Sequence, residues 1–315
     1  MTLAPVSLAD VHGARDRIAG IALRTPLVRV PTDVAADVHL KLENLQPIGS
    51  FKLRGAANAI ALADPATLAA GVYTASAGNM AQGVAWCARE RGLACRVVVP
   101  DHAPRAKTDA IARLGGKVVR VSFERWWQTL IDHEFPGMEG LFIHPFADPA
   151  VMAGNGTIAL EIFEDLTAVD AILVPYGGGG LACGISAAVR ALSPRTRVYA
   201  VEAESAAPLT ASLAAGAPVT VPVTRTFIDG MGSSSVSAEM WPLVRALLAG
   251  TIVVSVAQVS AAVRLIAERH HVIAEGAGAA GLAAALAGGF AGQRVVSIVS
   301  GGNIDLDTFA GLLTA

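Results

Sequence analysis

Short apolar segments rich in β-branched residues alternate along the chain with longer segments in which alanine and other apolar residues recur at helical spacing. The short segments predict buried strands, and the longer ones predict helices that cover them. Nearly continuous apolar strands separated by helices are typical of parallel sheets, so the pattern indicates a doubly wound α/β fold. We expect strands at 95–100, 117–122, 171–175, 197–201 and 294–299, and helices at 51–60, 106–114, 181–192 and 256–270.

Two segments refine this architecture. Residues 276–292 carry no charge, consist mostly of alanine and glycine, and are fewer than the roughly 20 strongly apolar residues that a membrane-spanning helix needs. We therefore expect a buried helix packed closely against a sheet, and no membrane association. Residues 71–147 contain at least two strand–helix units of their own. We predict a small domain at 71–147 and a large domain formed by 1–70 and 148–315.

The composition excludes several classes of function. The 24 basic and 26 acidic residues give a formal charge of -2, and because no basic tract occurs we expect no nucleic-acid partner. Hydrophobic residues make up 53% of the chain, which is typical of a well-buried globular protein. The cysteines Cys87, Cys95 and Cys183 each lie in an apolar segment, and the N-terminus shows no secretory signal. These features predict a reducing compartment and a cytoplasmic location.

Lys52 is the first candidate for chemistry. It lies between Phe51 and Leu53, in a chain of which only 16% of the residues are charged. An amine held among apolar groups has a lowered pKa and becomes a nucleophile for carbonyl compounds. The alternative is a surface lysine at the start of a helix, since most lysines are exposed.

A run of four glycines at 177–180 follows one predicted strand and opens the next predicted helix. Glycines leave the backbone N–H groups unobstructed, and the helix N-terminus adds partial positive charge. The run therefore predicts a phosphate site, although a purely structural turn remains an alternative. The residues in question are Gly177, Gly178, Gly179, Gly180 and the following Leu181.

Two further loops follow predicted strands. Ser76, Gly78 and Asn79 lie at the start of a helix, where backbone N–H groups can bind a carboxylate; an ordinary helix cap is the alternative. Ser300 ends the last strand, at the edge where open α/β sheets bind ligands, although a simple turn would look the same. The histidines show no metal-ligand spacing, and we expect 229–235 to be a loop outside any site.

Together, the lysine, the two glycine-containing loops and the terminal serine resemble the fold-type II pyridoxal-phosphate enzymes, and within them the threonine/serine dehydratase and serine racemase group. The match extends over nearly the whole chain and is carried by 41–55, 74–79, 144–157, 177–180 and 300–303. The resemblance implies two doubly wound parallel-sheet lobes with the cofactor between them. It also implies a homodimer, and a lyase that removes water and ammonia from a β-hydroxy amino acid (threonine, serine or a bulkier analogue) to give a 2-oxo acid.

The resemblance implies a role for each candidate residue. Lys52 would form the Schiff base with pyridoxal phosphate and then remove the substrate's α-proton, while Ser300 would bond the pyridine nitrogen. A hydroxyl there leaves the nitrogen unprotonated, which makes the ring a mild electron sink suited to elimination. Further cofactor contacts would come from Phe51, Asn79, Gly177, Gly178, Gly179, Gly180 and Leu181, and substrate contacts from Ser76, Ala77, Gly78, Asn79 and Met80.

Three positions in the expected active site depart from the family pattern. Ala77 stands where serine racemases carry the serine that acts as a second acid/base, which implies a lyase with little racemase activity. Met80 replaces a common histidine beside the substrate carboxylate, and Tyr176 is bulkier than the usual aliphatic residue. Both changes favour a β-substituent larger than a methyl group, such as the aryl group of phenylserine.

The resemblance leaves the metal open. Many relatives bind a divalent cation at an acid–x–x–x–Ala–x–Asp cluster, which Glu202 and Ala206 match, but Pro208 replaces the aspartate. We therefore predict no metal site and keep Glu202 and Ala206 as the weak candidates. The chain ends 15 residues after Ser300, so we expect no C-terminal regulatory domain and no feedback by isoleucine.

Three alternatives to the lyase remain. A racemase on the same fold is disfavoured by Ala77, and a β-replacement synthase by the dehydratase-like pattern. A non-catalytic binding module is disfavoured by the intact Lys52.

Overall fold

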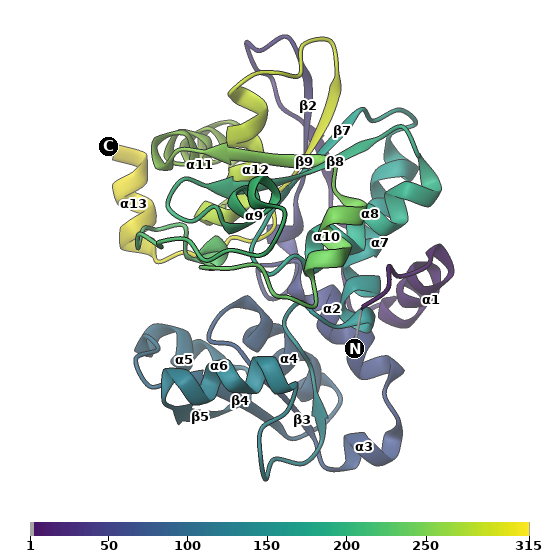
Figure 1. The fold of residues 1–315 in the computed structure, drawn as a ribbon, viewed down its shortest axis with the longest axis vertical. Helices are drawn as coiled ribbons and strands as arrows, with labels where there is room; N and C mark the ends of the chain where they lie inside the picture. Colours follow the sequence, from purple (N-terminus) through teal and green to yellow (C-terminus); the bar gives the residue numbers. More distant parts are fainter. Residues whose placement is uncertain (1–2, 315) are drawn as a thin grey trace.

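Two β-sheets organise the molecule, and each lies in a lobe of its own (Figure 1). The computed structural model describes residues 3–314. The six-stranded sheet has the order β1–β2–β10–β7–β8–β9, and the four-stranded sheet has the order β5–β4–β3–β6. The strands are β1 (Leu27–Arg29), β2 (Asp37–Lys41), β3 (Val72–Ala75), β4 (Cys95–Pro100), β5 (Lys117–Val121), β6 (Leu141–Phe142), β7 (Ala171–Pro175), β8 (Arg197–Ala203), β9 (Gly250–Val254) and β10 (Arg294–Ile298).

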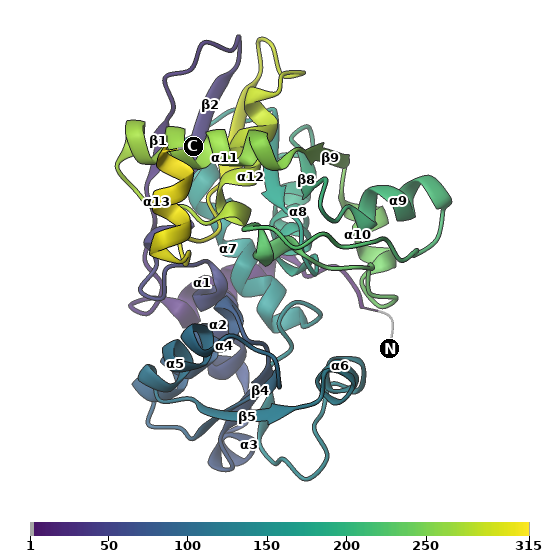
Figure 2. The same ribbon diagram turned by 90° about the vertical axis from the view of Figure 1, so that its left-hand side faces the viewer.

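Helices cover both sheets, and Figure 2 shows the two lobes one above the other after a quarter turn. The α-helices are α1 (Leu8–Ile18), α2 (Lys52–Leu62), α3 (Pro65–Ala69), α4 (Asn79–Glu90), α5 (Arg105–Arg113), α6 (Phe123–Asp132), α7 (Pro149–Asp165), α8 (Gly180–Leu192), α9 (Pro208–Ala215), α10 (Trp241–Leu247), α11 (Val256–His270), α12 (Gly276–Leu286) and α13 (Leu306–Thr314). Short 3₁₀ helices are η1 (Glu43–Leu45) and η2 (Asp229–Met231).

The predicted strands and helices are confirmed, and their ends shift by at most two residues. One difference concerns direction, because β1 runs antiparallel to β2 whereas the other pairings are parallel. The connection from β1 to β2 is short, and a short connection permits only antiparallel neighbours. Helix α11 ends at His270, as predicted, and His271 is the left-handed residue that follows it.

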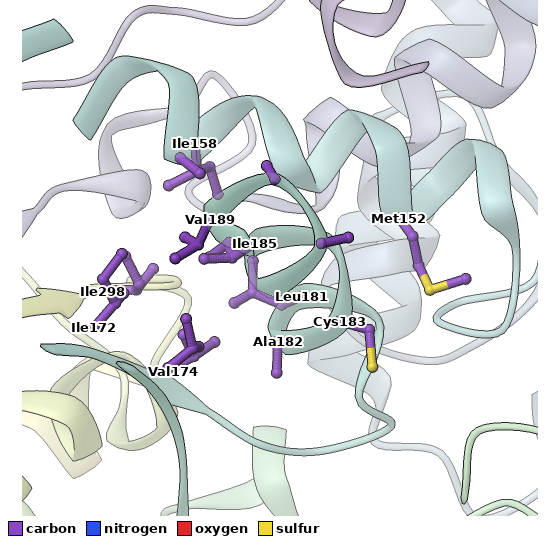
Figure 3. Close-up of a cluster of buried hydrophobic side chains, with 14 of the residues drawn as sticks. Met152, Ile158, Ile172, Val174, Leu181, Ala182, Cys183, Ile185, Val189 and Ile298 are labelled. Atoms are coloured by element: carbon purple, nitrogen blue, oxygen red, sulfur yellow. The ribbon is translucent and has the colours of Figure 1, made fainter. Parts of the chain in front are cut away.

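Strand β7 shows why a strand in the middle of the six-stranded sheet is apolar on both faces. Its side chains alternate between two cores: Ile172 and Val174 belong to the core that includes residues of α7 and α8, whereas Leu173 belongs to the core that includes residues of α11 and α12. Figure 3 shows the first of these cores, in which Ile185 and Val189 of α8 lie over the sheet. Burial on both faces is what removes the alternation of polar and apolar residues in such strands.

The alanine- and glycine-rich segment forms α12, which is buried against the sheet as predicted. At Gly281 an added Cβ would lie 2.4 Å from the Ser297 hydroxyl oxygen and 3.0 Å from the Leu173 carbonyl oxygen. Only small residues allow a helix to approach a sheet so closely. Within residues 3–314, no helix combines the length and the apolar character that crossing a membrane requires.

The four-stranded sheet is parallel throughout and also has helices on both faces. All four of its strands fall within 71–147, but α2 contributes Leu53, Ala56 and Ile60 to the core of this lobe as well. Helix α2 packs on α4 of the small lobe and on α7 of the large one. The domain limits at 71 and 147 therefore stay a prediction, since α2 is shared.

A buried network of charges fixes α2 on the large lobe. The Arg54 guanidinium donates to Glu43 on η1 (2.8 Å) and to Glu161 on α7 (2.6 Å), and it is only 1% exposed. Lys41, at the end of β2, donates to the other Glu161 oxygen at 2.5 Å. Because a buried charge must be paired, these contacts tie α2 to β2 and α7.

Candidate active site

A cavity of about 690 Å³ lies between the two sheets, at the carboxyl ends of β3, β7 and β10. This is the edge at which open α/β sheets bind their ligands. The fold brings to it all the residues to which the resemblance assigns a contact with the cofactor or the substrate. These residues are Phe51, Lys52, Ser76, Ala77, Gly78, Asn79, Met80, Gly177, Gly178, Gly179, Gly180, Leu181 and Ser300.

Lys52 is the first residue of α2, and its amine points into this cavity. The Phe51 N–H donates to the Ser300 carbonyl at 3.0 Å, which places the start of α2 beside the end of β10. The Lys52 Nζ donates to the Pro145 carbonyl at 2.5 Å and lies 5.1 Å from the centre of the Phe51 ring. Burial lowers the pKa of the Lys52 amine to about 8. About a tenth of this amine is therefore uncharged, and hence nucleophilic, at pH 7, far more than for an ordinary lysine.

The tetraglycine loop connects β7 to α8, and its backbone N–H groups are not covered by side chains. Gly179 has φ +92°, a left-handed conformation that favours glycine. An added Cβ at Gly178 would lie 2.2 Å from the Phe146 ring, so the loop and this ring are in close contact. Among the described residues, the N–H groups of Gly177, Gly178 and Gly179 have no hydrogen-bond acceptor. Together with the N-terminus of α8, they form a site for an anion.

The loop before α4 forms the opposite wall of the cavity. Its Ser76 hydroxyl accepts from the Gly78 N–H at 3.2 Å. The Asn79 amide is held at both ends: its Nδ2 donates to Glu275 Oε1 at 2.9 Å, and its Oδ1 accepts from Asn303 Nδ2 at 2.8 Å. An amide nitrogen carries two hydrogens, so one Asn79 N–H remains to donate to a ligand.

Glu275 is the residue of this site that the sequence analysis missed. It is 7% exposed, lines the cavity, and directly precedes the first residue of α12. Burial, and secondarily the charge of Asp229, raise the pKa of its carboxyl group to about 7. Nothing local distinguishes this glutamate in the sequence, because its burial arises only when α12 packs beside Asn79.

The serine-rich segment 229–235 was also misjudged, since we expected it to lie outside any site. It lines the cavity instead. Asp229 forms an ion pair with Lys107 of the small lobe, and both residues line the cavity. The pair joins residues 122 positions apart, which explains why the sequence alone did not reveal it.

Comparison with known proteins decides the family. The model of the family described as "Pyridoxal-phosphate dependent enzyme" matches residues 18–301. The chain belongs to this family. An L-threonine ammonia-lyase of Thermotoga maritima is 37% identical over 309 residues, which cover 96% of this chain and 77% of that protein. The Escherichia coli K12 protein named L-threonine dehydratase catabolic TdcB is 38% identical over 311 residues, with 96% and 94% covered.

Solved structures agree with the sequence relatives. The maize serine racemase structure has a TM-score of 0.89 at 33% identity and covers 99% of this chain and 98% of its own. A threonine deaminase from Solanum lycopersicum has a TM-score of 0.86 at 30% identity and covers 100% and 92%. These neighbours confirm the predicted fold type, and with the named ammonia-lyases they confirm the predicted enzyme group.

The residues of this pyridoxal-phosphate dependent enzyme fit its cofactor. The free N–H groups of the tetraglycine loop suit the phosphate. The loop also packs closely on Phe146, and because its four residues are glycines no side chain of theirs obstructs these N–H groups. The partly uncharged amine of Lys52 suits the aldehyde. Ser300, 3% exposed, lines the same cavity. The roles of the individual residues remain predictions.

The position of Tyr176 does not agree with the contact to the substrate side chain that its bulk suggested. It is 2% exposed and is absent from the cavity wall; its hydroxyl oxygen would lie 3.3 Å from a Cβ added to Gly179. The tyrosine therefore packs against the tetraglycine loop from outside the cavity. Met80, by contrast, lines the cavity while being 1% exposed.

Glu202 has a structural partner of its own. Its carboxylate accepts from the Leu209 N–H at 2.7 Å and from the Thr210 N–H at 2.8 Å and hydroxyl at 2.6 Å, so it caps the start of α9. The two carboxylate oxygens are both engaged, which supports the prediction that Glu202 and Ala206 hold no cation.

Proposed function

We propose that this enzyme is an ammonia-lyase that acts on β-hydroxy amino acids and releases a 2-oxo acid and ammonia. The observation that carries the proposal is the joint position of Lys52, the carboxylate loop and the tetraglycine loop around one cavity. The relatives named for threonine ammonia-lyase and threonine dehydratase activity support the same reaction class.

Each wall of the cavity has a task in this reaction. Pyridoxal phosphate supplies, when bound, an electron-withdrawing ring that acidifies the α-proton of an attached amino acid. The N–H groups of the tetraglycine loop would hold the phosphate, and the Ser300 hydroxyl, which lines the same cavity, would bond the ring nitrogen. The substrate carboxylate would bind at the N-terminus of α4, where the N–H groups of Ala77 and Asn79 have no acceptor among the described residues. The Lys52 amine, uncharged above pH about 8, takes up the α-proton.

The reaction balances without an oxidant. Loss of the α-proton and the β-hydroxyl removes one water; hydrolysis of the resulting enamine returns one water and releases ammonia. The net change is the loss of ammonia from the amino acid.

Ala77 supports elimination over racemisation. A racemase needs an acid on the face opposite the lysine to return a proton there, and the methyl group of Ala77 cannot supply one. Ala77 lines the cavity between Ser76 and Gly78. After the α-proton is removed, we therefore expect loss of the β-hydroxyl group and not return of a proton to the opposite face.

The proposal is tested with the purified holoenzyme and L-serine, L-threonine and L-threo-phenylserine in turn. Formation of 2-oxo acid is measured together with chiral chromatography of the remaining amino acid. We expect 2-oxo acid without D-enantiomer, and more D-enantiomer from the Ala77→Ser variant. Rapid D-enantiomer formation by the unchanged enzyme would instead show a racemase, and the absence of oxo acid from all three substrates would refute the lyase.

We also propose a location and an assembly state for the enzyme. The cysteines Cys87, Cys95 and Cys183 are free and buried, which supports a reducing, cytoplasmic location. A homodimer is proposed from the family resemblance and can be tested by light scattering of the holoenzyme. Chelation with retention of activity would support the prediction that no divalent cation is needed.

A further inference from the structure

One face of α6 lines the active-site cavity with large apolar side chains. The residues are Phe123, Trp126, Trp127 and Leu130. Their spacing of three, four and seven positions places them on a single face of the helix. None of them belongs to the sets that hold the cofactor or the substrate carboxylate, so this wall needs a separate explanation.

The three aromatic rings form a continuous surface. Phe123 stacks on Trp127, with ring centres 6.4 Å apart and planes at 11°, and Trp126 lies 5.6 Å from Phe123 and 6.1 Å from Trp127. Phe123 is 47% exposed and Trp127 39% exposed. Large aromatic side chains left partly exposed inside a cavity are typical of a surface that binds a ligand.

This aromatic wall lies next to the loop that holds the substrate. Trp126 packs against a cluster formed by Ala75, Val98 and Leu130, and Ala75 directly precedes Ser76 of the carboxylate loop. A substrate whose carboxylate is bound at the start of α4 has its side chain within reach of this ring. The Trp126 Nε1 atom is buried without a hydrogen-bond partner among the described residues.

The wall is also held in place relative to the cofactor site. His133, which ends α6 in a left-handed conformation, contacts Glu239 of the large lobe at 3.0 Å and stacks on His144 at 4.5 Å between ring centres. His144 contacts Phe146 edge-on at 4.4 Å, and Phe146 lies against Gly178 of the tetraglycine loop. A chain of ring contacts thus links the end of α6 to the phosphate site.

We propose that Phe123, Trp126 and Trp127 bind an aryl group on the β-carbon of the substrate, so that the enzyme prefers 3-arylserines to serine and threonine. This inference rests on the proposed function and specifies its substrate class. A methyl group or a hydrogen would leave most of the aromatic wall in water, whereas a phenyl group would cover it. The bulk that Tyr176 suggested from the sequence is provided by α6 instead.

The experiment compares kcat/KM of the holoenzyme for L-threo-phenylserine and L-threonine. We expect the unchanged enzyme to favour phenylserine. In Trp127→Ala and Trp126→Ala, kcat/KM for phenylserine falls by about tenfold to a hundredfold, mainly through KM, with a smaller loss for threonine. Trp127→Phe retains a ring and should retain most of the preference. Ile131→Ala is the matched control, since Ile131 lies on α6, is 58% exposed and does not line the cavity.

A binding measurement separates this inference from the proposed reaction. L-phenylalanine lacks the β-hydroxyl and cannot undergo the elimination, so its Kd and that of L-alanine are measured by calorimetry on the holoenzyme. We expect tighter binding of phenylalanine, with the difference lost in Trp127→Ala. If threonine is converted but phenylalanine and alanine bind equally, the aryl site is refuted while the lyase stands. If no substrate is converted but phenylalanine binds through Trp127, the lyase is refuted while the aryl site stands.

Discussion

Asn79 donates a hydrogen bond from Nδ2 to Glu275 Oε1 at 2.9 Å, and this contact joins the first residue of α4 to the residue before α12. It connects the two lobes at the centre of the active site. Because Glu275 is buried, its carboxyl group stays partly protonated near neutral pH.

Replacement of Glu275 by glutamine changes how stability depends on pH. The carboxyl pKa is raised from 4.5 to about 7 in the folded protein, so ionisation costs the folded state free energy as the pH rises from 4.5 through 7. At pH 8 this cost is on the order of 3 kcal/mol. Glutamine does not ionise and still accepts from Asn79. We expect Glu275→Gln to be more stable than the unchanged enzyme at pH 8, with a smaller difference at pH 5.5. Chemical denaturation at the two pH values measures this, and an equal difference at both would contradict it.

Loading of the cofactor should follow the ionisation of Lys52. Because burial lowers the pKa of the amine to about 8, the rate at which the apoenzyme acquires the visible absorbance of bound pyridoxal phosphate should rise through pH 8 and then level off. An ordinary lysine would give a rise centred near 10.5. Lys52→Ala should show no such band. A rate that keeps rising to pH 10 would argue against the lowered pKa.

A substitution at Gly178 tests whether the tetraglycine loop binds the phosphate of the cofactor. An added Cβ would lie 2.2 Å from the Phe146 ring, so Gly178→Ala must displace either the loop or the ring. We expect pyridoxal phosphate to bind the variant at least about tenfold more weakly, because the backbone N–H groups move away from the phosphate. Equilibrium dialysis measures the affinity. The double variant Gly178→Ala/Phe146→Ala should recover part of the loss. Gly311→Ala is the matched control, because a Cβ there has no neighbour within 4 Å.

The buried charge network should matter far more than the exposed pairs. Arg54→Leu leaves the Glu43 carboxylate, which is 0% exposed, without its partner, and the expected loss of stability is about 3–5 kcal/mol. Arg24→Leu removes an ion pair with Glu164 in which both side chains are more than 40% exposed, and should cost no more than about 1 kcal/mol. Urea denaturation of both variants measures the difference. Similar losses would show that the network contributes little.

Removal of divalent cations should leave the enzyme intact. Both oxygens of Glu202 accept hydrogen bonds at the start of α9, so a chelator should change neither the activity nor the midpoint of thermal unfolding. Glu202→Ala should still lower that midpoint, because the cap of α9 is lost. A fall in activity on chelation that added Mg²⁺ or Ca²⁺ reverses would contradict this prediction.

The sequence by itself determined the elements and most of the site. Buried parallel strands must be apolar on both faces and must end at one edge, so strand positions and the residues that follow them, such as Ser76, Gly177 and Ser300, are recognisable without coordinates. Lys52 was recognisable because a charged residue is unusual in an apolar segment. These signals are local: each depends on a residue and its near neighbours in the chain.

The tertiary structure alone decided the contacts between lobes. Glu275 is an ordinary glutamate until α12 packs beside α4, and Lys107 meets Asp229 only across the cleft. The aromatic residues of α6 recur at helical spacing in the sequence. Only the position of that helix in the fold shows that these residues border the substrate site. Burial and the pKa it sets depend on every group packed around a residue, and most of those groups are remote in sequence.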